Sequence, residues 1–115
     1  MMKNEAITTV DKASIHDTTM PLLDSMYSEF KELSKKKPDS AVNKNKISIT
    51  NRLLAKVRIV LNNEDSIEFL DLLDEDSIPQ VSDVTLILSQ YVAAMNAFRE
   101  KYHGWNGAES IWFTK

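Results

Sequence analysis

The chain has 115 residues, of which 43% are hydrophobic and 27% are charged, and its formal net charge is −3. This length is typical of one domain with a real core, and the absence of cysteine excludes disulfides, thiolate metal sites and cysteine nucleophiles. The chain contains only two glycines and three prolines, which is too few for a sheet-rich fold with many tight turns. We therefore expect an all-α protein.

Hydrophobic residues occur in short stretches along the chain. No stretch approaches the roughly 18 apolar residues that a membrane-spanning helix needs. The N-terminus also lacks the apolar core of a signal peptide. We therefore expect a cytoplasmic protein without membrane contact.

The N-terminal region is polar up to residue 18 and shows no sustained hydrophobic period. We interpret residues 1–18 as a flexible tail and residues 19–115 as the helical domain. A first helix is predicted from near Thr19, with Pro21 in its first turn and Pro38 just beyond its end. Its apolar stripe consists of Leu23, Met26, Phe30 and Leu33, widened by Leu22 and Tyr27.

Two shorter helices are predicted in the middle of the chain. One runs from about Ile47, or a turn earlier, to Leu61. The other is short, opens at Asp65 and carries apolar residues as far as Leu73. An acidic connection that ends at Pro79 follows it.

The fourth predicted helix has the clearest hydrophobic period, with Ser82 as its expected N-cap. Apolar residues recur there at intervals of four and three, which gives a seam of period near 3.5. The seam consists of Val84, Leu88, Tyr91, Met95, Phe98 and Tyr102. It predicts either an internal core contact or a homodimer seam through Leu88, Tyr91, Met95 and Phe98.

A turn signal follows the fourth predicted helix, with Gly104 at its end and an Asn-Gly pair at Asn106. We expect this C-terminal segment to form a short turn or hairpin packed on the helices. The predicted fold is thus a small bundle of about four helices with a polar N-terminal tail.

Charge is segregated along the chain. Residues 40–63 contain five basic residues and no acidic one, whereas residues 59–98 contain eight acidic residues and no basic one. Such blocks either neutralise each other or form a docking surface for a charged partner. The candidate partner-binding residues are Lys44, Arg52, Lys56, Asp71, Asp74, Glu75 and Asp76.

No group of residues predicts a cofactor, a metal or a catalytic set. The acidic run that ends at Asp76 lacks the spacing and the glycine of a calcium loop. Glycines only at positions 104 and 107 exclude a glycine-rich phosphate loop. An enzyme is therefore the less favoured class.

The sequence favours a non-enzymatic protein–protein interaction module, such as a regulatory, inhibitory or assembly subunit. Its partner would be another protein or a second copy of the chain. A first alternative is nucleic-acid binding through phosphate contacts by the basic segment that begins at Lys35 and ends at Arg58. In a second alternative, Arg99 and His103 resemble the Arg–His pair of HEPN-type helical ribonucleases, in which more residues separate the two. That resemblance implies a ribonuclease-like activity.

Overall fold

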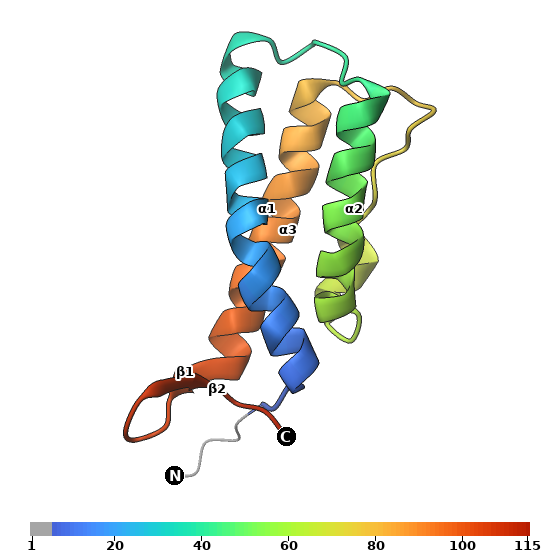
Figure 1. Ribbon diagram of the computed structural model, residues 1–115. Coiled ribbons are helices and arrows are strands. Elements are labelled where there is room, and N and C mark those ends of the chain that lie inside the picture. The colour runs from blue at the N-terminus through green and yellow to red at the C-terminus, as the bar shows by residue number, and fades with distance from the viewer. Residues whose placement is uncertain (1–5) are drawn as a thin grey trace.

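The computed structural model describes residues 6–115, which form three α-helices followed by a small hairpin (Figure 1). The helices are α1 (Val10–Lys36), α2 (Lys44–Leu61) and α3 (Val81–Tyr102), and a 3₁₀ turn, η1 (Asp65–Phe69), follows α2. The strands β1 (His103–Trp105) and β2 (Ser110–Trp112) pair antiparallel at the end of α3. The predicted mostly helical fold with a C-terminal hairpin is confirmed. The short helix predicted from Asp65 to Leu73 is present only as the 3₁₀ turn over Asp65–Phe69, so residues 6–115 contain three α-helices and not about four.

Helix α1 begins earlier than predicted, at Val10 and not near Thr19. Its N-cap is Thr9, whose side chain accepts a 3.1 Å hydrogen bond from the backbone N–H of Lys12. The interpretation of residues 1–18 as a tail is therefore wrong from Val10 onward, and residues 1–5 lie outside the described part of the chain. Pro21 consequently lies inside α1, where it removes one backbone hydrogen bond.

The first turns of α1 belong to the core although their inward residues are small or polar. Ala13, His16 and Thr19 are all buried. His16 Nε2 lies 2.9 Å from the carbonyl oxygen of Met95, and the hydroxyl of Thr19 donates to a carbonyl one turn back. These hydrogen bonds satisfy polar groups at core positions. Because Ala13, His16 and Thr19 are small or polar, hydrophobic periodicity does not identify them as core residues.

The apolar seam of α3 lies inside a single chain. Leu88, Tyr91 and Met95 are fully buried and Phe98 is nearly so. Helix α3 packs against both α1 and α2, and the three helices run side by side (Figure 1). The seam is therefore internal, and the alternative of a homodimer seam through these four residues is wrong.

The N-cap of α3 lies two residues before the predicted N-cap, Ser82. Gln80 is the N-cap residue, and its backbone N–H donates to the carboxylate of Asp83 at 3.0 Å. The backbone N–H of Ser82 donates to the carbonyl of Pro38. The connection between α1 and α2 thus satisfies part of the α3 terminus.

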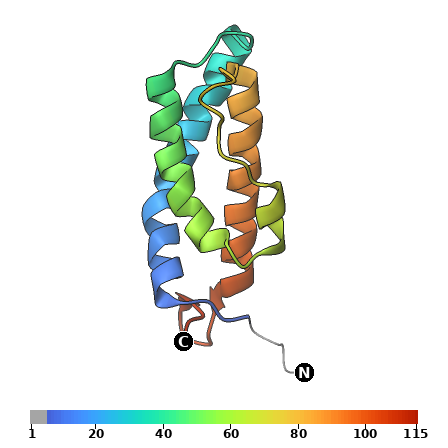
Figure 2. The same ribbon diagram turned by 90° about the vertical axis from the view of Figure 1, so that its right-hand side faces the viewer.

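Residues 70–73 run in extended form across α2 and α3, and residues 75–77 form a turn before the chain reaches α3 (Figure 2). Leu70 and Leu73 point inward and are buried. The Tyr91 hydroxyl donates a 2.9 Å hydrogen bond to the Asp71 carbonyl, and the Arg58 guanidinium donates to the carbonyl of Leu70. From Leu70 onward, an extended chain replaces the predicted helix, and side chains of α2 and α3 bind its backbone.

The C-terminal hairpin packs on the N-terminal part of α1 and the C-terminal part of α3. The indole of Trp112 lies edge-on to His16, with 5.0 Å between ring centroids, and its Nε1 donates to Asp17. Beyond β2, the backbone of Phe113 accepts from the N–H of Thr8. Within residues 6–115, no helix has both the length and the hydropathy needed to cross a bilayer.

Candidate partner-binding groove

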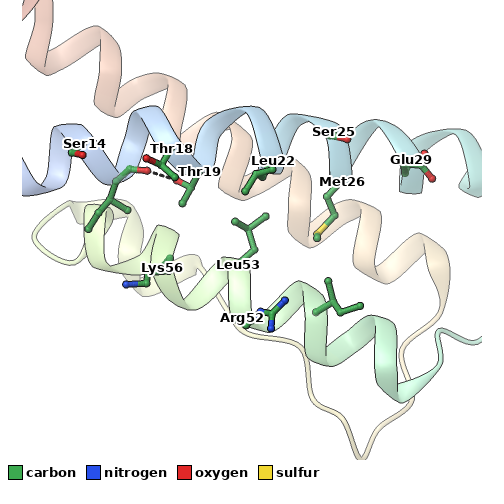
Figure 3. A pocket seen from close by; sticks show the side chains of 12 residues that line it. Ser14, Thr18, Thr19, Leu22, Ser25, Met26, Glu29, Arg52, Leu53 and Lys56 are labelled. Carbon is green, nitrogen blue, oxygen red and sulfur yellow. Dashed lines mark hydrogen bonds between the residues drawn. The ribbon is translucent and has the colours of Figure 1, made fainter.

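The grooves on the two flanks of α2 differ in what covers them. On one flank, residues 70–73 lie against α2 and α3, where Asn51 and Tyr91 bind their backbone. The groove between α1 and α2 is open and has a volume of about 670 Å³ (Figure 3). Its apolar surface comes from Ile15, Leu22, Met26, Ile49 and Leu53. We refer to it as the α1/α2 groove.

Leu22 is the most exposed apolar residue of the α1/α2 groove, with 56% of its surface accessible. The exposure of Leu22 follows from helix geometry, because neighbouring residues are 100° apart and Leu23 already points into the core. The side chains of Leu22 and Leu53 face each other from α1 and α2 (Figure 3). A large apolar residue is thus held open to solvent between two helices.

The two rims of the α1/α2 groove differ in charge. Arg52 and Lys56 lie one turn apart on the α2 rim. Within residues 6–115, neither side chain forms an ion pair. The α1 rim carries the carboxylate of Glu29 near one end and otherwise hydroxyl groups, namely those of Ser14, Thr18 and Ser25. The rim on α2 is therefore a cationic edge beside an apolar floor.

The predicted partner-binding residues divide between two surfaces. Arg52 and Lys56 line the α1/α2 groove, whereas Lys44 lies beside Glu75 in a separate depression near Ile78. The remaining predicted carboxylates, those of Asp71, Asp74 and Asp76, are exposed on the segment that covers the other flank of α2. In the described part of the chain, the two ion pairs are Lys35–Glu32 and Lys101–Glu64. No ion pair there joins the basic block to the acidic block.

Arg99 and His103 come together at the end of α3, with 3.5 Å between a guanidinium nitrogen and His103 Nε2. The His103 ring lies edge-on to Trp112 at 5.0 Å between centroids. Burial lowers the pKa of His103, and the positive charge of Arg99 lowers it further. A role of this pair in catalysis stays a prediction.

Two features of the site were not identified from the sequence. The hydrophobic period places Leu22 on the apolar stripe of its helix, although its neighbour Leu23 indicates that one of the two must face outward. Asn51, which binds the backbone of Leu73, had no such signal because an isolated asparagine on a helix is usually solvated.

Comparison with known proteins assigns no family, since no family model, curated protein or solved structure matches this chain. Among residues 6–115, no three or more His, Asp or Glu side chains are grouped so as to hold a metal ion.

Proposed function

We propose that this protein binds a segment of another protein chain in its α1/α2 groove. The observation that carries the proposal is an open apolar groove in which Leu22 is exposed beside Leu53 and Met26. Burial of apolar surface contributes about 25 cal/mol per Å², and apolar grooves with polar rims are typical sites for peptide segments. A bound segment would remove the groove from water.

Charge specifies the chemistry of the bound segment. Arg52 and Lys56 on the α2 rim favour carboxylates on the facing side of the segment. The hydroxyl groups on the α1 rim favour polar, uncharged side chains there. From Ser14 to Glu29 the groove follows α1 for about 20 Å, given a rise of about 1.5 Å per residue. It can thus hold about four turns of a helix or a shorter extended segment.

The chain itself contains an example of such a segment. Leu70 and Leu73 cover the neighbouring groove between α2 and α3, while the carboxylates of Asp71 and Asp74 remain outside. An acidic segment with spaced leucines therefore fits against α2 on one flank. The basic and apolar α1/α2 groove offers comparable chemistry on the other.

The test uses two labelled amphipathic peptides that share one leucine stripe, flanked by glutamates in one and by lysines in the other. We expect the glutamate peptide to bind more tightly, and Leu22→Glu to weaken its binding at least about tenfold, which corresponds to about 1.4 kcal/mol. Leu86→Glu is the matched control, because Leu86 is an exposed leucine on α3 outside the groove. Equal binding by the Leu22→Glu variant, or preference for the lysine peptide, would contradict the proposal.

Nucleic-acid binding by the same cations is distinguished by a second titration with a short DNA duplex. Phosphate contacts depend on Arg52 and Lys56 and weaken steeply with salt, but they do not require an apolar groove. We expect no duplex binding that competes with the peptide. Tight, competitive binding of the duplex would overturn the proposal in favour of the nucleic-acid alternative.

A further inference from the structure

A second exposed surface of the same chain has the chemistry that the α1/α2 groove requires. It consists of the acidic residues and exposed apolar residues from Glu68, near the end of η1, to Ile78, and we call it the acidic face. Phe69 is 67% exposed, and Leu72 and Ile78 are also exposed. The carboxylates of this face belong to Glu68, Asp71, Asp74, Glu75 and Asp76.

We infer that the α1/α2 groove receives the acidic face of a second copy, so that chains associate head to tail. The inference rests on the proposed function, because it names the partner of the same groove. Phe69 and Leu72 would enter the apolar part of the groove. Carboxylates such as that of Asp71 would lie against Arg52 and Lys56 of the neighbouring copy.

The acidic face is held in place before any partner arrives. Asn51 binds the backbone of Leu73 through two 2.8 Å hydrogen bonds, and Tyr91 binds the carbonyl of Asp71. Leu70 and Leu73 anchor the segment in the core. A segment that is already ordered loses little conformational entropy on binding, which favours affinity.

The charges of the acidic face are available to a partner. Within residues 6–115, none of its carboxylates takes part in an ion pair, and neither do Arg52 and Lys56. With a net charge of −3, two copies repel each other at most orientations. The head-to-tail orientation places the basic block of one copy against the acidic block of the next.

The two surfaces lie on opposite flanks of α2, so one chain cannot fill its own groove with its acidic face. At 100° per residue, Asn51 and Arg58 point to the side of α2 opposite Ile49 and Lys56. Asn51 and Arg58 bind the segment of the acidic face, whereas Ile49 and Lys56 line the groove. A contact between different surfaces is heterologous and produces rings or open chains of copies.

The experiment measures mass in solution by light scattering for the wild type and two blocked variants. Arg52→Glu with Lys56→Glu blocks the groove, and Phe69→Ser with Leu72→Ser blocks the acidic face. All four positions are exposed, so the fold should be retained. Leu86→Ser removes an exposed apolar residue elsewhere and serves as the control.

The wild type and the control should exceed the single-chain mass of 13.1 kDa as concentration rises from about 10 μM to about 1 mM, the Kd range of a weak contact. Added salt should reverse the increase. Each blocked variant alone should stay at the single-chain mass. An equimolar mixture of the two should reach twice that mass, because one intact groove meets one intact acidic face.

Three results would overturn the inference. If the wild type keeps the single-chain mass at low salt but binds the glutamate peptide, the groove serves a different protein and the proposed function stands. If the wild type neither associates nor binds the peptide, both proposals fail. Association of either blocked variant with itself would also overturn the inference, because another surface would then make the contact.

Discussion

The side chain of Asn51 exchanges two hydrogen bonds with the backbone of Leu73, a residue 22 positions further along the chain. Its Nδ2 donates to the Leu73 carbonyl and its Oδ1 accepts from the Leu73 N–H, each at 2.8 Å. A side chain on a helix thus satisfies the backbone N–H and C=O groups of an extended segment, as the backbone of a neighbouring strand would. The pair holds the acidic segment in the groove between α2 and α3.

Replacement of Asn51 by alanine should lower the free energy of unfolding by about 2 kcal/mol. Both backbone groups of Leu73 would lose their partner, and each unsatisfied buried group costs about 1–3 kcal/mol. Asn45→Ala, at an exposed position of the same helix, should change stability by less than about 0.5 kcal/mol. Urea unfolding measures both variants. A loss no larger than that of the control would mean that solvent replaces the pair at no cost.

Truncation of Leu88 to alanine should cost about 2–5 kcal/mol, because this side chain is fully buried and the change leaves a cavity. Leu86→Ala, two residues away on the exposed side of α3, is the matched control and should be nearly neutral. Thermal unfolding followed by circular dichroism compares the two. Similar melting temperatures would contradict an internal seam.

The unfolding free energy should decrease as the pH falls below 6.5, in part because of His103. Burial and the charge of Arg99 lower the pKa of His103 in the folded chain from its ordinary value of 6.5. Below 6.5 the unfolded chain therefore takes up a proton that the folded chain does not, which favours unfolding. This loss of stability begins near pH 6.5, grows as the pH falls to the lowered pKa of the folded chain, and is constant below that pKa.

An NMR titration of the His103 ring checks the direction of the shift. Arg99→Gln should raise the pKa of His103 toward 6.5 and reduce the loss of stability between about pH 7.5 and about pH 5. A wild-type pKa of His103 above 6.5, or one that is insensitive to Arg99→Gln, would refute this explanation.

Replacement of Ile78 by glycine should raise the unfolding free energy by up to about 1 kcal/mol. The backbone of Ile78 has φ 49°, in the left-handed region that a β-branched residue adopts only with strain of about 1–2 kcal/mol. Its side chain is 56% exposed, so little buried surface is lost. Ile78→Ala makes a similar truncation but keeps a Cβ atom, and it should give a smaller gain. Equal effects of the two substitutions in chemical denaturation would show that strain at Ile78 is not the cause.

Much of the helical fold could be predicted from the sequence. The seam through Leu88 and Met95 places α3 almost to its end, because apolar residues at intervals of three and four fit only one face of a helix. The start of α1 could not be predicted in this way. His16 and Thr19 occupy core positions, and the groups that satisfy them are backbone carbonyls, which no sequence pattern displays.

By itself, the sequence determined the helical periods, the C-terminal hairpin and the separation of basic from acidic residues. The tertiary structure decided which apolar residues remain in water. The leucines from Leu70 to Leu73 suit a short helix as well as an extended segment, and Asn51, far away in the chain, selects the extended form by binding its backbone. That choice covers one flank of α2 and leaves the other open at Leu22. An apolar side chain is buried only where another segment covers it, and contacts between distant parts of the chain determine where each segment lies.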